Sequence, residues 1–184
     1  MNYRCKVCVL ALGITVAATS LAQTSSEAQR GETSMRDAVS TMSPQEFVTK
    51  AGMDGMTEVQ LGQWAAKQAL SNDVKSFAQQ MTTDHSKTNA ELTTLAQRKG
   101  LSAPAVLDPE HENLVKMLRS KSGAAFDTAY ANEMVGAHDK AIALFTSAGR
   151  SNDADIAAFA KKALPTLQMH KQMAQKLAAK SGGQ

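Results

Sequence analysis

The sequence predicts an all-α protein whose core is a bundle of four long helices. Its composition is 43% apolar but only 4% aromatic, a mixture that favours helices over sheets. Apolar residues recur three and four positions apart over long stretches, which is the spacing of a buried helix face. The 184 residues suit one domain with short extensions. We therefore expect one helical domain over residues 43–180 and a tail over 181–184.

Start and stop signals predict where each helix begins and ends. Ser43-Pro44-Gln45-Glu46 has the pattern of a capping box with proline at the first helical position. Asn72-Asp73 and Asn152-Asp153 can open helices, whereas Gly100 and Gly149 can end them. These signals predict long helices over about 44–70, 72–99, 123–148 and 153–180, and a short helix over 109–120.

The lengths of the connections predict how the helices are arranged. Links of about two residues join the first helix to the second and the third to the fourth, so each pair should form an antiparallel hairpin. The connection between the hairpins, residues 100–122, is long enough to cross the bundle and contains the short helix. This pattern indicates a ferritin-like four-helix bundle, with a plain up-down bundle carrying a decorated loop as the alternative.

Residues 1–22 have the order of a secretory signal peptide. Arg4 and Lys6 precede an apolar run over 7–18, and the small residues Ser20 and Ala22 flank Leu21 before a cleavage site after Ala22. The run is shorter than the ~20 residues of a membrane span. We expect a periplasmic or secreted protein without a membrane span after cleavage. Residues 23–42 are polar and are expected to form a disordered leader.

Charge and cysteine content exclude several classes of function. Without Arg4 and Lys6, 18 of the 20 basic residues remain beside 17 acidic ones, and they form no run. A nucleic-acid-binding protein needs a concentrated cationic face, so we do not expect nucleic-acid binding. Cys5 and Cys8 are the two cysteines and both lie in the signal peptide. The mature chain would therefore have no thiolate ligand or cysteine nucleophile.

Four ionisable residues fall within the apolar faces, one on each long helix. They are Glu58, His85, His138 and His170. Each lies near the middle of its helix, so the four are expected to meet at a similar height in the bundle. Three imidazoles and a carboxylate are a competent ligand set for zinc, copper or iron. The first hypothesis is therefore an exported protein that binds a transition metal for storage, delivery or stress protection.

Further residues are expected around this site, and a second hypothesis explains the same pattern. Asp84, Tyr130 and Glu133 are expected to support the ligands, whereas His111 is expected to be solvated and uninvolved. The second hypothesis is a buried His/Glu hydrogen-bond network in a non-catalytic structural or stress-interaction protein of the cell envelope. The sequence is compatible with a homo-oligomer.

Enzymatic di-iron chemistry is not expected. Di-iron bundles carry a Glu-x-x-His motif on each of two helices. Thr82 and Leu167 stand where the glutamates would precede His85 and His170. Both motifs are therefore broken, and we expect no enzyme of this class.

Motifs on all four long helices together carry a family resemblance. They are Phe47-Val48, Gly55, Glu58-Val59, Leu61-Gly62, Val74-Lys75-Ser76-Phe77-Ala78, Met81, Asp84-His85-Ser86-Lys87, Asn89, Phe126-Asp127, Tyr130, Met134-Val135, His138, Phe159-Ala160, Leu164-Pro165, Leu167 and His170. These stretches resemble those of an exported bacterial family catalogued as domain of unknown function 4142. The resemblance covers roughly residues 43–177 and implies a ferritin-like bundle without an established activity. Where the family usually has Asp before the third-helix histidine, this chain has Ala137, and Asp139 follows instead.

Overall fold

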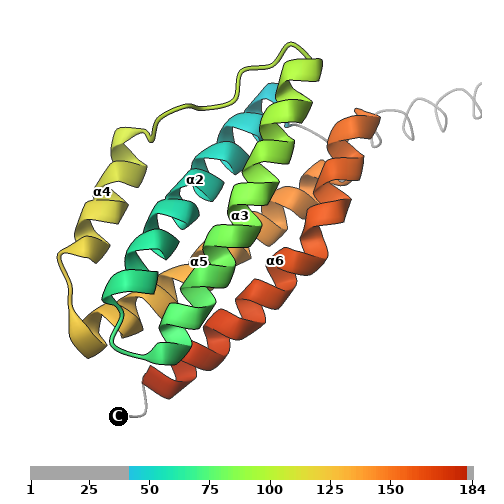
Figure 1. Ribbon diagram of the computed structural model, residues 1–184. Helices are drawn as coiled ribbons and strands as arrows, with labels where there is room; N and C mark the ends of the chain where they lie inside the picture. Colours follow the sequence, from blue (N-terminus) through green and yellow to red (C-terminus); the bar gives the residue numbers. More distant parts are fainter. Residues whose placement is uncertain (1–41, 182–184) are drawn as a thin grey trace, which may run out of the picture. The chain divides into compact units, whose positions relative to one another are not determined.

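The computed structural model describes residues 42–181, and these residues form helices and connecting segments with no strand among them. The helices are α2 (Pro44–Gln68), α3 (Asn72–Arg98), α4 (Pro109–Arg119), α5 (Gly123–Ala148) and α6 (Ala154–Ser181) (Figure 1). The all-α prediction and its five helices are thus confirmed. The predicted signal peptide (1–22), all but the last residue of the predicted leader (23–42) and residues 182–184 of the predicted tail lie outside the described residues.

The helix ends follow the local signals, with one change. The Ser43 hydroxyl accepts a hydrogen bond from the backbone N–H of Glu46 at 3.1 Å, which caps α2. Gly100 adopts a φ of 65°, the left-handed conformation in which glycine ends a helix without strain. At the start of α3, however, the capping side chain is Ser71, whose hydroxyl accepts from the N–H of Asp73 at 3.2 Å. The predicted pair at 72–73 already lies inside the helix.

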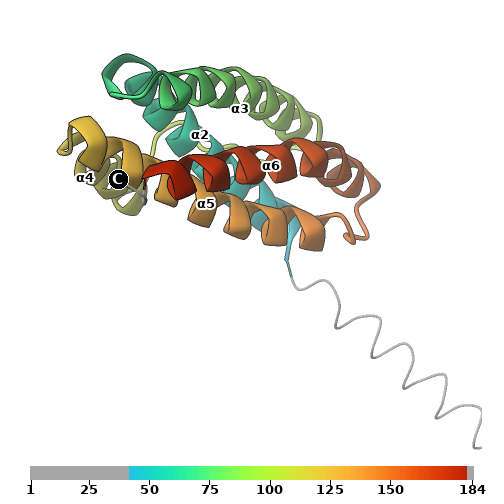
Figure 2. The same ribbon diagram turned by 90° about the horizontal axis from the view of Figure 1, so that it is seen from below.

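The four long helices pack as two hairpins, α2 with α3 and α5 with α6 (Figure 2). Smaller contacts join α2 to α5 and α3 to α6, and α4 lies against α2 and α5. The C-terminal halves of α3 and α5 belong to the same apolar cluster, so these two helices run in the same direction. The segment between them therefore travels the length of the helices and includes α4 (Figure 1).

The apolar core of the bundle is divided into two clusters by a layer of polar side chains. One cluster includes Leu61, Phe77, Phe126 and Leu177. The other takes its residues from the opposite ends of the same four helices and includes Phe47, Leu92, Phe145 and Ile156. On every long helix one buried ionisable residue lies between the two clusters. These residues are Glu58, His85, His138 and His170.

Small residues on α2 let α3 approach closely beside this layer. A Cβ atom at Gly62 would lie 2.6 Å from the hydroxyl of Thr82 and 3.0 Å from the carbonyl oxygen of Ala78. At Gly55 it would meet the side chain of Asn89. Both glycines lie within about one helical turn of Glu58. They therefore bring the Glu58 carboxylate within reach of α3.

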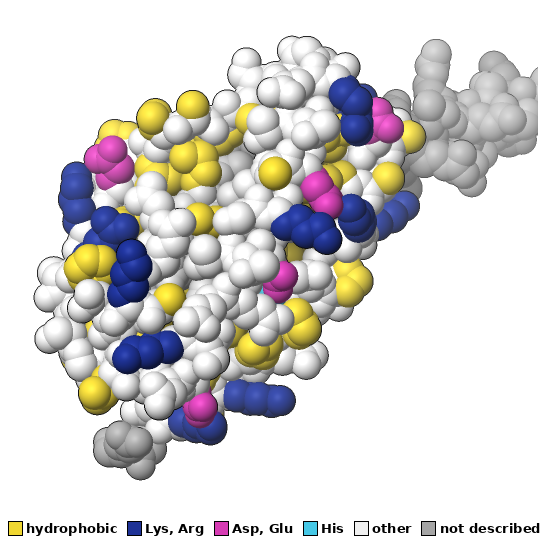
Figure 3. All heavy atoms as spheres, viewed as in Figure 1, with side chains coloured by type: hydrophobic (Ala, Val, Ile, Leu, Met, Phe, Trp, Pro, Cys, Tyr) yellow, Lys and Arg dark blue, Asp and Glu magenta, His cyan; other side chains and the backbone are white. Residues whose placement is uncertain are grey.

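No helix within residues 42–181 combines the length and apolar character needed to cross a membrane. On the face seen in Figure 3, basic side chains lie in several separate places, with acidic and apolar side chains between them. The basic residues on this face are thus dispersed.

Candidate metal centre

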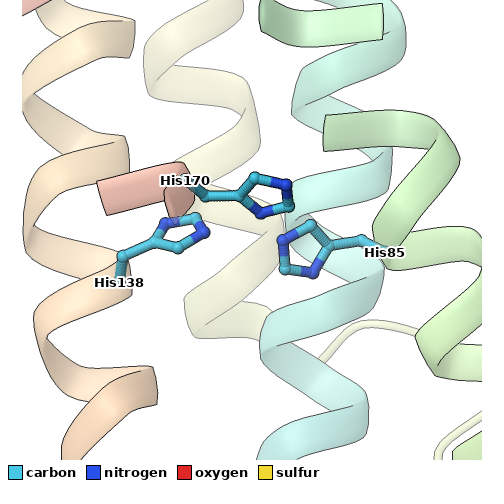
Figure 4. Close-up of side chains that lie close together, drawn as sticks. All are labelled: His85, His138 and His170. Atoms are coloured by element: carbon cyan, nitrogen blue, oxygen red, sulfur yellow. The ribbon is translucent and has the colours of Figure 1, made fainter. Parts of the chain in front are cut away.

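Three histidines from three helices meet in the polar layer of the bundle. His85 comes from α3, His138 from α5 and His170 from α6, and their rings face a common region (Figure 4). The ring centroids are 5.2 to 5.5 Å apart in all three pairs. One ring nitrogen from each residue lies within 4.8 Å of those of the other two. The arrangement is thus close to an equilateral triangle of imidazoles.

Each ring is held in place by a contact to one of its two nitrogens. The Nδ1 atom of His85 lies 2.9 Å from Oε2 of Glu58, and Nε2 of His170 lies 2.9 Å from Oδ2 of Asp84. The Nδ1–H of His138 donates to the carbonyl oxygen of Met134 at 2.8 Å. Because carboxylate and carbonyl oxygens accept, these contacts place the proton of each neutral ring on its outer nitrogen.

The second nitrogen of each ring is buried without a hydrogen-bond partner among the described residues. These atoms are Nε2 of His85, Nε2 of His138 and Nδ1 of His170. When all three rings are neutral, the outer contacts leave a lone pair on each of these atoms, so each can only accept. Three acceptors cannot satisfy one another, and a buried polar atom without a partner is costly. The interior of the triangle therefore suits an electron-pair acceptor.

Burial and charge have opposing effects on the pKa values of Glu58 and His85, which contact each other in the polar layer. Burial alone would raise the pKa of Glu58, but the charge and hydrogen bond of His85 outweigh it and hold that pKa below its usual value. Burial alone would lower the pKa of His85, but attraction to Glu58 raises it above the usual value. In the protein without a bound cation, both shifts therefore favour an ion pair between Glu58 and His85.

The other two histidines are kept neutral. His138 and His170 have no exposed side-chain surface. Burial lowers the pKa of both rings below the ordinary value, and repulsion from His85 acts in the same direction. A neutral imidazole is the form that binds metal. Two of the three rings are thus already in the ligating form at neutral pH.

Comparison with protein families matches residues 16–177 to the family described as "Domain of unknown function (DUF4142)". The chain belongs to the DUF4142 family. Neither the curated proteins nor the solved structures contain a significant match. The description of the family names no activity, so the chemistry of this DUF4142 chain has to be argued from its own residues.

The sequence-predicted residues of this DUF4142 chain occupy different places around the histidines. Glu58 binds the outer nitrogen of His85 through Oε2, while its Oε1 lies 3.6 Å from Nδ1 of His138 and has no hydrogen-bond partner within residues 42–181. Asp84 contacts His170. Glu58 and Asp84 therefore stand behind the rings.

The structure places Tyr130 and Glu133 in different surroundings. Both were expected to support the ligands. Tyr130 is fully buried, and burial together with the nearby charge of Glu58 raises the pKa of its hydroxyl far above the usual value. Its hydroxyl has no hydrogen-bond partner among the described residues. Glu133 is half-buried and lines a cleft that also reaches Glu58. Tyr130 thus belongs to the core and Glu133 to the cleft.

The prediction that His111 is solvated holds only in part, and its lack of involvement in the metal site stays a prediction. Its side chain is only 22% exposed. Its Nδ1 lies 2.7 Å from Oδ1 of Asp108, at the start of α4, and its Nε2 lies 3.3 Å from Oδ1 of Asp54 on α2. Sequence reasoning placed His111 in the acidic first turn of a short helix but could not place that helix against α2. His111 is the residue through which α4 contacts a carboxylate of α2.

Sequence reasoning did not single out two carboxylates that make contacts between helices, Asp54 and Asp127. Asp54 lies four residues before Glu58, so it shares a face of α2 with it, and this spacing was a usable signal. Asp127 is buried and accepts hydrogen bonds from the backbone N–H groups of Leu70 and Ser71 at 3.0 and 2.7 Å. It thereby fixes the turn between α2 and α3 to α5. No local pattern marks Asp127, because its partners lie more than 50 positions earlier in the chain.

Proposed function

We propose that the protein binds one transition-metal ion through His85, His138 and His170. The observation that carries the proposal is the set of three buried, unpartnered ring nitrogens, one from each of three converging helices. In metal proteins a ligating histidine generally donates its other N–H to a carboxylate or a backbone carbonyl. All three rings have such an outer contact. The sequence pattern predicted that Glu58 is itself a metal ligand. In this proposal Glu58 instead orients the ligand His85.

The dimensions of the triangle are compatible with a metal ion. Metal–nitrogen bonds of ~2.0–2.1 Å place ligand nitrogens ~3–4 Å apart. One nitrogen of each ring lies within 4.8 Å of one nitrogen of each of the other two rings, so shifts of up to about one ångström would bring these atoms to the spacing of metal ligands. Three protein ligands also leave a fourth coordination position, as in sites that keep a water molecule or an exchangeable ligand.

The donor set and the surrounding charge favour a divalent cation of intermediate softness. Imidazole nitrogens suit zinc, copper and iron, and the mature chain would contribute no thiolate. Glu58 and Asp84 place two carboxylates behind the rings. Their combined charge offsets that of a divalent ion in a buried site, where an uncompensated charge is expensive. Zinc, copper and iron therefore remain the candidates.

We also infer that the bundle follows the ferritin-like plan. Two hairpins, a long connection that contains α4, and the common direction of α3 and α5 support this inference. The site nevertheless differs from a di-iron centre, because Thr82 and Leu167 occupy the glutamate positions of both Glu-x-x-His motifs. The proposal is therefore a single metal ion held by histidines.

The alternative is a buried His/Glu network without a metal. The ion pair between Glu58 and His85 and the contact between Asp84 and His170 favour it, because both would form without a cation. The three unpartnered ring nitrogens count against it, since a network that exists for stability should satisfy its members. The two functions predict different results when one core histidine is replaced. A metal site would lose its metal, whereas a network without metal would lose only stability.

The test is a metal titration of the full chain. The protein is stripped with a chelator, reconstituted separately with zinc, copper and ferrous iron, and its metal content is measured by mass spectrometry. We expect one ion per chain in the wild type, loss of the ion in His85→Ala, His138→Ala and His170→Ala, and retention in the matched control His111→Ala. A wild type that retains no metal, with core variants that only melt earlier, would establish the network instead.

We further propose that the protein is exported and acts in the periplasm or outside the cell. The basic, apolar and small-residue order of residues 1–22 supports this proposal. Mass spectrometry of the protein recovered from the cell envelope should give a chain that begins at Gln23. A chain that begins at Met1 in the cytoplasmic fraction would contradict export.

A further inference from the structure

A cleft of about 260 Å³ opens between α2, α4 and α5. Its outer wall contains the exposed side chains of Glu110 and Lys140, and its middle contains the half-buried Asp54 and Glu133. Its inner wall contains Glu58 together with buried apolar side chains. The cleft thus runs from the surface of the bundle to the carboxylate that orients the metal centre.

The charge of this cleft is unbalanced toward the negative sign. Four carboxylates line it, from Asp54, Glu58, Glu110 and Glu133, against Lys140 and the imidazole of His111, which contacts Asp54. A cleft lined by one sign of charge between low-dielectric walls raises the local concentration of ions of the opposite sign. The lining therefore favours a small cation.

The innermost carboxylate provides an independent indication of a cation. Glu58 is only 3% exposed, lines the cleft, and its Oε1 has no hydrogen-bond partner within the described part of the chain. The same carboxylate reaches Nδ1 of His85 with Oε2 and lies 3.6 Å from Nδ1 of His138 with Oε1. A cation bound to Oε1 would thus lie beside the outer nitrogens of His85 and His138, two of the three proposed ligands.

We propose that this cleft is the access route through which a divalent cation reaches the three histidines, with Glu58 as the last transfer site. This inference rests on the proposed metal centre. Asp54 and Glu133 attract the cation into the cleft, and Glu58 receives it at the inner end. Transfer to the rings requires a brief separation of Glu58 from His85, which frees the imidazole to turn toward the cation.

The opposite side of the bundle offers a weaker route. A smaller cleft of about 120 Å³ lies between α3 and α6 and reaches Asp84, which contacts His170. Two carboxylates, Asp84 and Glu91, face two lysines there, and Lys162 binds Glu91 at 2.8 Å. This balanced charge gives a cation no electrostatic advantage. Glu91 is therefore a matched control, because it lines the cleft whose charge is balanced.

The test is the rate at which metal-free full chain binds cobalt(II), followed by stopped-flow absorption. We compare the wild type with Glu133→Gln, with the double variant Asp54→Asn/Glu133→Gln, and with the control Glu91→Gln. We expect association to slow about tenfold in the double variant at low ionic strength, less in the single variant, and not at all in the control. The difference should shrink at ~1 M salt, where the screening length is about 3 Å.

Equilibrium binding separates the possible failures. If the cleft is only a route, cobalt affinity in the double variant should stay within about threefold of the wild type, because a route changes association and dissociation together. Equal association rates in all four proteins, with normal equilibrium binding, would overturn the access route and leave the metal centre intact. A wild type that binds no cobalt at equilibrium would overturn both. The single variant Glu133→Gln keeps the test decisive if Asp54→Asn impairs folding.

Discussion

The protein places its histidines in two contrasting settings, three in the core and one between α2 and α4. All but His138 make their closest polar contact with a carboxylate. His111, however, uses both ring nitrogens, one for Asp108 and one for Asp54. Each core histidine uses one nitrogen and keeps the other without a partner. A carboxylate contact therefore does not distinguish a metal ligand, whereas free nitrogens from several helices facing one region do.

The pKa of His111 and the pKa values of two of the three core histidines also shift in opposite directions. Burial is the largest single effect on His111 and disfavours its charged form, but the hydrogen bonds and charges of Asp108 and Asp54 together outweigh it and raise the pKa above the usual 6.5. Burial lowers the pKa of His138 and His170. At neutral pH the outer histidine is thus biased toward a proton, and the two core rings toward the neutral form that can bind a cation.

The largest expected difference between the two settings is the stabilisation by metal. A ligand at 100 to 1,000 times its dissociation constant adds about 3–4 kcal/mol to the free energy of unfolding. We expect zinc to raise the melting temperature of the wild type and of His111→Ala, because both keep the triad. His138→Ala should show no such rise. Thermal denaturation with zinc and with excess chelator measures the effect, and equal rises in both variants would remove His138 from the site.

The carboxylate behind His85 should have the next largest effect. Glu58→Gln keeps the shape of the side chain but removes the charge that holds the Nδ1 proton of His85. Loss of such an outer partner typically lowers metal affinity 10–100-fold. A competition titration against a chromophoric chelator measures the change. Glu46→Gln, on an exposed position of the same helix, is the control, and a similar loss in both variants would contradict a specific role for Glu58.

Asp84 should have a smaller effect than Glu58. Its contact with His170 is as short, but its side chain is 32% exposed while that of Glu58 is 4% exposed. Water can therefore replace part of the lost hydrogen bond. We expect Asp84→Asn to lower metal affinity about tenfold, at the weak end of effects for outer partners. If this variant loses more affinity than Glu58→Gln, burial does not determine how strongly each carboxylate affects metal affinity.

The smallest expected effect concerns pH and His111. Because its folded pKa lies above the usual 6.5, its pairing with Asp54 and Asp108 stabilises the fold fully below pH ~6.5 and is lost as the pH rises through the raised pKa. His111→Ala should therefore cost roughly 0.5–1 kcal/mol at pH 6. The part of this cost that depends on the proton of His111 should be lost by pH 9. Urea unfolding of metal-free wild type and variant at both pH values measures this difference.

Metal occupancy of the core should respond to pH in the opposite direction, because protons compete with metal for the three ring nitrogens. Acid should thus strengthen the contact of His111 and weaken metal binding by the triad. A cost of His111→Ala that grows from pH 6 to pH 9 would show that the assigned direction of its pKa shift is wrong.

Helical periodicity was sufficient to predict the four members of the polar layer. His85 and His170 fall within regular apolar stripes, and the structure buries both. The roles within the layer were not predictable, because they depend on which nitrogen faces which oxygen. The contact of His111 with Asp54 was missed for a related reason: it spans 57 positions and depends on where α4 lies.

The sequence by itself determined the helices, their ends and the set of residues that face inward, because these follow from patterns that repeat within a few turns of one helix. Only the tertiary structure decided that Glu58 stands behind His85, that three ring nitrogens remain free, and that α4 completes an acidic cleft leading to them. Those features depend on distances of a few ångströms between helices. Such distances are set by packing, here by the close approach of α3 to the glycines of α2.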